Sequence, residues 1–183
     1  MNIPALVRER YKIWSRFLTE QVGFSLQHSQ QHTKEHCARV LLFYLLFAQR
    51  ENLSEQDADA LAMAACFYDS RRINDGLDIG HGHRAAKYYC TWCAEHEYVL
   101  DARVVFIMAY HEQNDKLGKA ALQREFSDDP TPALGRCCND PVDTPSGRSS
   151  AQLKSPPQSA ELWNSYNHVV VIIQCLKSKV LAI

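Results

Sequence analysis

Apolar residues recur at helical spacing along most of residues 3–112, and this periodicity is the strongest constraint on what the chain can fold into. Residues at i, i+3, i+4 and i+7 share one face of an α-helix, whereas a half-buried strand alternates apolar and polar residues. The spacing predicts helices over residues 3–22, 31–50, 55–69, 82–97, 101–112, 117–126 and 159–181, and no segment alternates convincingly. We therefore expect an all-α bundle of about six helices.

Two of these segments have a more specific pattern. The apolar members of segment 3–22 are Ile3, Leu6, Val7, Ile13, Trp14, Phe17 and Leu18. Segment 31–50 is apolar almost all round, which predicts that it is the central helix of the bundle. Ser54 stands directly before the third segment and is followed by acidic residues, so we expect it to be the N-cap.

Composition excludes several classes of protein. A chain of 183 residues with 46% hydrophobic and 22% charged residues is long enough for one domain with a buried core. Lys and Arg number 20 and Asp and Glu 21, so a nucleic-acid binder driven by net positive charge is not expected. The longest apolar run, residues 40–48, spans roughly half a bilayer, which predicts no membrane segment.

The two ends of the chain carry further signals. Charged residues crowd positions 8–12, where a secretory signal peptide has an apolar core, and the cysteine count of seven is odd. These features predict a cytoplasmic protein with reduced thiols.

Six of the seven prolines lie between residues 130 and 157. We expect a helical core over residues 1–127, a Pro/Ser-rich loop or disordered segment over 128–158, and a C-terminal helix over 159–183 that packs on the core. A changed reading frame in the last third would also produce this composition.

Four polar residues lie at helical spacing from apolar residues, at the start or the end of the apolar face of their segment: His36, Asp69, His81 and His111. A short turn near residue 52 makes segments 31–50 and 55–69 antiparallel. His36 lies 16 residues before that turn and Asp69 lies 17 after it, so both are about 25 Å from the turn at about 1.5 Å per residue. His81 and His111 are placed similarly about a turn near residue 98. We therefore expect three imidazoles and a carboxylate to meet at one end of the bundle.

Imidazole and carboxylate together form a ligand set for a divalent metal ion, and the residues leave open whether it is Mn, Fe, Ni, Zn or Mg. Each residue also has an ordinary interpretation. A single histidine on an apolar face is more often a hydrogen-bonded core residue than a ligand, and Asp69 alone could be a helix-end residue. The joint placement of all four favours the metal site.

Four sequence blocks carry a resemblance to a known family: HTKEHCARV at 32–40, AACFYDSRR at 64–72, DIGHGHRAA at 78–86 and AYHEQND at 109–115. Together they resemble the HD-domain superfamily of metal-dependent phosphohydrolases, over roughly residues 20–127. The resemblance implies an all-helical core, a divalent metal and hydrolysis of a phosphoester or nucleotide. His36 matches the first ligand histidine of the family and Asp69 the aspartate of the paired His-Asp signature. His81 and His111 match the later histidines, which bind a second metal or contact the phosphate and the attacking water.

The chain departs from the family pattern at two positions. Tyr68 stands where the signature has its histidine, and a neutral phenol is a poorer ligand than imidazole. The family's closing ligand is an aspartate on a late helix, but segment 159–181 has no Asp, and Asp140 and Asp143 lie in the Pro/Ser-rich segment. His168 is a weak candidate to replace it. We therefore expect weak or absent metal in the purified protein, and recovery of metal binding when Tyr68 is changed to His.

The residues and the resemblance together lead to a functional expectation. We expect a metal-dependent phosphohydrolase with His36, Asp69, His81 and His111 as metal ligands and with Asp69, His81 and Arg72 in catalysis. In this interpretation Arg72 and its neighbour Arg71 neutralise phosphate charge, although a solvated helix end is the slightly favoured interpretation of both arginines. The substrate would be a small phosphorylated molecule or nucleotide, with no nucleic-acid or membrane partner, and a homodimer is left open. The alternative is a catalytically inactive HD-fold module that binds a ligand or a partner.

Two minor motifs have less specific interpretations. His28 and His32 are four residues apart on a predicted helix start, where they form either a metal pair or, more commonly, two solvated side chains. Cys90 and Cys93 form a C-x-x-C pair without the βαβ context of a redox motif, which indicates two packed thiols. His83 is two residues from His81 and so is expected to face away from the site.

Overall fold

The computed structural model describes residues 3–29 and 32–111. In that part of the chain it contains five α-helices and no strand: α1 (Ala5–Gln21), α2 (Lys34–Arg50), α3 (Glu55–Phe67), α4 (His81–Glu95) and α5 (Ala102–Tyr110). The all-α class is confirmed for these residues. The predicted helices at 117–126 and 159–181, the Pro/Ser-rich segment and the domain limits at residues 127 and 158 lie outside the described residues and stay predictions.

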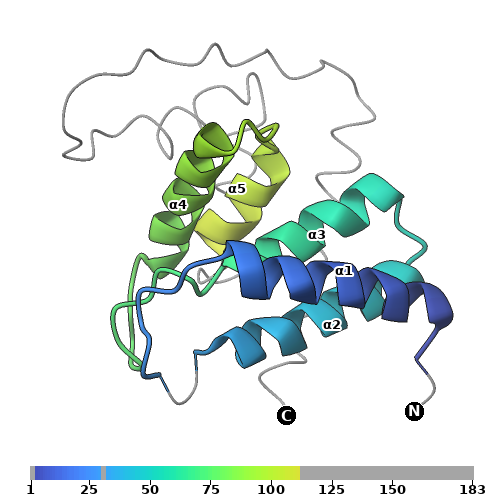
Figure 1. Cartoon of the computed structure of the whole chain (residues 1–183), viewed down its shortest axis with the longest axis horizontal. Helices are drawn as coiled ribbons and strands as arrows, with labels where there is room; N and C mark the ends of the chain where they lie inside the picture. The colour runs from blue at the N-terminus through green and yellow to red at the C-terminus, as the bar shows by residue number, and fades with distance from the viewer. Residues whose placement is uncertain (1–2, 30–31, 112–183) are drawn as a thin grey trace.

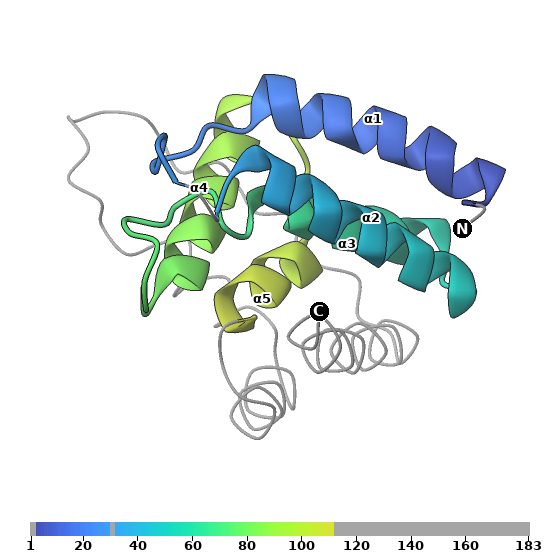
Figure 2. The ribbon, with the colours of Figure 1, turned by 90° about the horizontal axis from the view of Figure 1, so that it is seen from below.

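The helices form two hairpins, α2–α3 and α4–α5. The second hairpin packs on helix α3 of the first. α2 and α3 run antiparallel and α1 lies along both of them, while α4 and α5 form a second hairpin that packs on α3 (Figure 1). Seen from below, α1 and α5 lie on opposite sides of the α2–α3 pair (Figure 2). The antiparallel arrangement expected from the short turns is therefore present in both hairpins.

The central helix is α3, and the prediction that segment 31–50 would be central is wrong. Every residue of α3 from Ala58 to Phe67 except Asp59 is buried, and this helix contacts each of the other four. On α2, by contrast, Phe43 is 39% exposed. The physical reason is side-chain size: alanines at 58, 60, 62, 64 and 65 let neighbouring helices approach α3 closely from several sides.

The helix ends follow their capping residues. The Ser54 hydroxyl accepts a hydrogen bond from the Asp57 N–H at 3.1 Å, which confirms the predicted N-cap of α3. Thr33 caps α2 in the same way through the N–H of His36, so α2 begins at Lys34 rather than at residue 31. On α1, Leu6 and Ile13 are 55% and 67% exposed, although periodicity placed both on the apolar face.

The cysteines of the described residues fall into two groups. Cys37, Cys66 and Cys93 are free and buried, and burial raises the pKa of the Cys93 thiol to about 11. Cys90 is disulfide-bonded, so the expectation of reduced thiols fails at that position. Within the described residues, every helix is too short or too polar to cross a bilayer.

Candidate metal centre

Four helix ends meet at one side of the molecule, and each contributes one residue to a polar cluster. His36 lies in the first turn of α2, Asp69 follows the end of α3, His81 is the first residue of α4, and His111 follows α5. The structure brings all four together, as the two antiparallel hairpins require. His32, which precedes α2, joins them. Two groups within this cluster have the spacing of a cation site: His32, His36 and Asp69, and Asp69, His81 and His111.

Asp69 is the residue shared by both groups. Its side chain is only 2% exposed, and its Oδ1 atom has no hydrogen-bond partner among the described residues. Oδ1 lies within ion-pair distance of the His81 Nε2 atom at 3.4 Å and of the Arg72 Nη1 atom at 3.6 Å. A buried carboxylate oxygen without a hydrogen bond is costly, and the Arg72 guanidinium compensates only part of that cost. The remaining capacity of Oδ1 to accept is an observation that fits a bound metal ion.

The imidazoles of His81 and His111 face each other on the Oδ1 side of Asp69. The His81 Nδ1–H donates to the Asp78 carbonyl oxygen at 2.7 Å, and the His111 Nδ1–H donates to the Met108 carbonyl oxygen at 2.7 Å. When both imidazoles are neutral, these two donations use their single N–H groups and each Nε2 atom presents a lone pair. The two Nε2 atoms are 2.8 Å apart, and the Arg72 Nη1 atom lies 3.4 Å from that of His81. Two ligand nitrogens at roughly 2.1 Å from one ion are separated by roughly 3 Å, so the pair fits a shared cation.

The other carboxylate oxygen of Asp69 faces a second pair of imidazoles. The His32 Nδ1 atom lies 2.8 Å from Oδ2, and the His36 Nε2 atom lies 3.6 Å from the same oxygen. The two rings are edge to face with their centroids 5.7 Å apart. Each carboxylate oxygen of Asp69 is thus near two imidazoles that come from different segments of the chain.

Tyr68 contacts His36 of this second pair and also the ring of His111. Burial raises its pKa well above the usual value of a phenol, so the hydroxyl stays protonated, and it donates to His36 Nε2 in the tautomer in which the imidazole proton is on Nδ1. Burial also lowers the pKa of His36, which keeps the imidazole neutral. Tyr68 is therefore a hydrogen-bond donor to the lone pair that His36 would offer to a metal.

Arg71 and Arg72, which follow Asp69, pack against other residues and are not solvated. The interpretation of both as a solvated helix end is therefore wrong. Arg72 is buried, donates from Nη2 to the Gly76 carbonyl at 2.6 Å, and directs Nη1 at His81 Nε2 at 3.4 Å. Arg71 lies over the ring of Tyr88, with its guanidinium carbon 3.3 Å from the ring centroid. Arg72 thus places a positive charge next to the candidate site, whereas Arg71 has a packing role.

The sequence interpretation of the first two histidines needs correction. His28 and His32 precede the first turn of α2, so the i,i+4 spacing of a helix does not apply to them. His28 is exposed, whereas His32 is half-buried against Asp69. Helical periodicity had no means to detect His32, because the residue lies in the loop before the N-cap. His83 is exposed, as expected, and contacts the ring of Tyr110.

Gly82 holds the two hairpin helices close together at the site. A Cβ atom at this position would lie 2.3 Å from the Met108 carbonyl oxygen and 3.1 Å from His111 Nδ1. We predict that Gly82→Ala destabilises the fold by about 1–3 kcal/mol and weakens metal binding, because it pushes away the carbonyl that orients His111. Urea unfolding and metal titration measure the two effects. Gly23→Ala is the control, since its Cβ would meet Tyr88 Oη at an ordinary 3.4 Å; equal losses in both variants would contradict this account.

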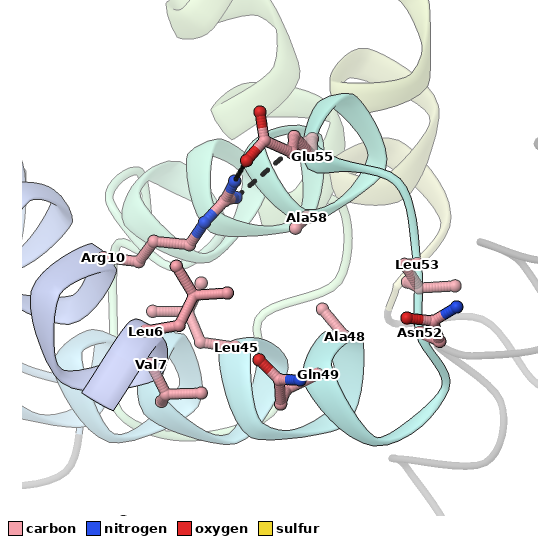
Figure 3. Close-up of a pocket in the computed structure, with 10 residues that line it drawn as sticks. All are labelled: Leu6, Val7, Arg10, Leu45, Ala48, Gln49, Asn52, Leu53, Glu55 and Ala58. Carbon is pink, nitrogen blue, oxygen red and sulfur yellow. Dashed lines mark hydrogen bonds and ion pairs between the residues drawn. The ribbon is translucent and has the colours of Figure 1, made fainter. Parts of the chain in front are cut away.

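A hollow of about 100 Å³ lies at the other end of the α2–α3 pair, between α1 and the turn that joins the two helices (Figure 3). Its walls are mostly apolar, with Leu6, Val7 and Leu45 on one side and the ion pair of Arg10 and Glu55 across the top (Figure 3). It contains none of the candidate ligands. Among the described residues, the candidate metal ligands therefore lie at the opposite end of the α2–α3 hairpin from this hollow.

The fold and cluster define a helical protein whose His/Asp groups can hold a metal ion. Comparison with family models, curated proteins and solved structures finds no match for this chain. The assignment of a function therefore depends on the geometry of the site and on the resemblance of its motifs.

Proposed function

We propose that the protein is an HD-type metal-dependent phosphohydrolase that acts on a phosphoester or nucleotide. The observation that carries the proposal is the buried Asp69 carboxylate, whose Oδ1 has no hydrogen bond among the described residues and lies 3.4 Å from the His81 Nε2 atom, in a group of three ligand residues completed by His111. His36, Asp69, His81 and His111 are the residues that would hold the ion. Neutral imidazoles and one carboxylate fit Mn, Fe, Ni or Zn better than Mg, which favours oxygen ligands.

The chain's own residues have separate tasks in this reaction. A divalent metal held by these residues would supply an activated water and polarise a phosphoryl oxygen. Asp69 would hold the ion through its carboxylate and orient the attacking nucleophile. The carbonyls of Asp78 and Met108 hold His81 and His111 in the tautomer that leaves Nε2 free of a proton. Arg72, buried beside Asp69, offsets negative charge that develops on the phosphate.

The proposal is tested first by metal analysis of protein purified without chelators, then by titration with Mn²⁺, Ni²⁺ and Zn²⁺. A panel of phosphomonoesters, phosphodiesters and nucleotides is then assayed for phosphate release with each metal. We expect metal-dependent hydrolysis of at least one phosphorylated class. Metal binding without hydrolysis of any of them would refute the enzyme and leave the binding module, and no binding would refute the enzyme and its metal centre.

The second candidate is an HD-type module that has lost catalysis. Tyr68 favours it, because the phenol donates its hydrogen bond to the His36 nitrogen that a metal would need. A weakly bound ion, or none, would leave a helical domain that only binds a nucleotide or presents a surface to a partner. The same metal analysis separates the two functions.

Replacement of Tyr68 tests whether this side chain limits metal binding. We predict that Tyr68→His raises metal affinity by about tenfold or more, because it adds an imidazole and removes the hydrogen bond to His36. Tyr68→Phe removes only the hydroxyl and is the matched variant, with a smaller expected gain. Isothermal titration with Ni²⁺ measures both. Unchanged affinity in both variants would show that Tyr68 is not the limiting residue.

A further inference from the structure

We propose that His32 is a metal ligand and that, with His36 and the Oδ2 atom of Asp69, it forms a second cation site next to the one on the Oδ1 side. The proposal deepens the proposed function and rests on it, since both sites share Asp69. The class of ligand is a divalent transition-metal ion, because two imidazoles and one carboxylate oxygen are its preferred donors. His32 lies outside the ligand set that the motif resemblance implies.

The first argument is the arrangement of donors around Oδ2. The His32 Nδ1 atom is 2.8 Å from Oδ2 and the His36 Nε2 atom is 3.6 Å from it. The Tyr68 hydroxyl is hydrogen-bonded to the same His36 Nε2 atom. In the tautomer in which His36 Nε2 carries a lone pair, a cation that displaces this hydrogen bond would have two imidazole nitrogens and the Oδ2 atom within reach. The Oδ1 side, where His81 faces the other oxygen at 3.4 Å, has the same feature.

The second argument is that His32 is held in place by its own contacts. Its backbone N–H donates to the Ser29 hydroxyl oxygen at 2.6 Å, and that hydroxyl donates in turn to the Asp75 carboxylate. The next residue, Thr33, caps α2 and fixes the chain immediately after His32. The backbone of His32 is therefore fixed on both sides, which limits the positions that its ring can take and lowers the entropy cost of ligating an ion next to Asp69.

The third argument is access. The side chains of His32 and His36 are 19% and 27% exposed, whereas Asp69 beneath them is 2% exposed. An ion on the Oδ2 side would therefore be open to water and substrate, while its carboxylate ligand stays shielded. The His81 side is more enclosed, with that side chain 9% exposed. The two sides of Asp69 thus differ in exposure, and the Oδ2 side is the one that solvent reaches more easily.

A different role for His32 must be separated from ligation. Its Nδ1–H can simply donate to Oδ2 and orient Asp69 for an ion on the Oδ1 side. His32→Asn distinguishes the two roles, because its amide nitrogen occupies nearly the position of Nδ1 and keeps the hydrogen bond but is a poor ligand for a transition metal. His32→Ala loses both functions. His28→Ala, at an exposed histidine four residues earlier, is the matched control.

The experiment measures bound Ni²⁺ or Co²⁺ per chain by elemental analysis after equilibrium dialysis, with isothermal titration and the visible spectrum of Co²⁺ as further readouts. Melting of the chelator-treated proteins shows that the variants are folded. We expect two ions in the wild type and in His28→Ala, and one in both His32→Ala and His32→Asn, with a changed Co²⁺ spectrum. If an unfolded His32→Ala prevents its use, His32→Asn and His32→Gln carry the test.

The possible outcomes separate this inference from the proposed function. Unchanged stoichiometry and affinity in His32→Asn would overturn the ligand role and leave the Oδ1 site intact. One ion in the wild type that is lost in both His32 variants supports His32 and contradicts the site of His81 and His111. One ion that neither His32 variant changes overturns the inference alone. No ion in the wild type overturns both proposals.

Discussion

Asp69→Asn is expected to reduce metal affinity by more than about 100-fold and to abolish any metal-dependent hydrolysis. The carboxylate is the one residue common to both groups of candidate ligands, and an amide at this position removes its negative charge. Because Asn and Asp have nearly the same shape, we expect the chelator-treated variant to keep its helical content. Isothermal titration with Ni²⁺ and phosphate release measure the loss, and circular dichroism verifies the fold.

Asp59→Asn is the matched control for this prediction. Asp59 lies in α3, ten residues before Asp69, is 51% exposed and forms an ion pair with Arg10 rather than with the cluster. The same substitution there should leave metal affinity unchanged. If Asp69→Asn binds metal as tightly as this control does, the cluster around Asp69 is not the metal centre, and the proposed function fails with it.

Arg103→Ala is expected to lower the free energy of unfolding by about 3 kcal/mol, the largest effect on stability that we predict outside the site. Arg103 on α5 donates to Asp57 of α3 at 2.7 Å and to Asp101 at 2.6 Å, and its side chain is 13% exposed. Its removal leaves the Asp57 carboxylate, 12% exposed, without this cation. Urea unfolding in the presence of a chelator measures the change.

A surface pair provides the control for the stability prediction. Arg16 and Glu20 form an i,i+4 ion pair on α1 with side chains 77% and 50% exposed. We expect Arg16→Ala to change the unfolding free energy by less than about 0.5 kcal/mol. In an Asp57→Asn background the cost of Arg103→Ala should fall, because the charge that Arg103 compensates is gone. An equal cost in both backgrounds would show that Arg103 stabilises α5 by packing alone.

The contacts that stabilise the fold and the candidate ligands lie on the same helices, α4 and α5. α5 presents His111 at its C-terminal end and is attached to α3 at its N-terminal end by Arg103. Gly82 sets the separation of α4 from the same helix near His111. Loss of either contact is therefore expected to disturb the His81–His111 pair as well as the free energy of unfolding.

Local patterns predicted a large part of this structure. Helical periodicity located all five described helices within a few residues, because the spacing of apolar side chains is a property of each segment by itself. Ser54 was predicted as a cap for the same reason, since capping involves only neighbouring residues. The placement of His36 and Asp69 at the same end of a hairpin followed from helix length and a short turn alone.

The tertiary structure decided everything that depends on contacts between segments. It made α3 the central helix, because its alanines admit neighbours from several sides, whereas the sequence pattern predicted segment 31–50 to be central. It brought His32 from a loop to within 2.8 Å of Asp69, which no periodicity can predict. It buried Arg72 and left Asp69 Oδ1 without a hydrogen-bond partner in the part of the chain that the structure describes. The sequence alone determined which residues form helices and that the candidate ligands lie at one end of the bundle. Only packing determined which oxygens and nitrogens face one another. That arrangement depends on distances between residues far apart in the chain.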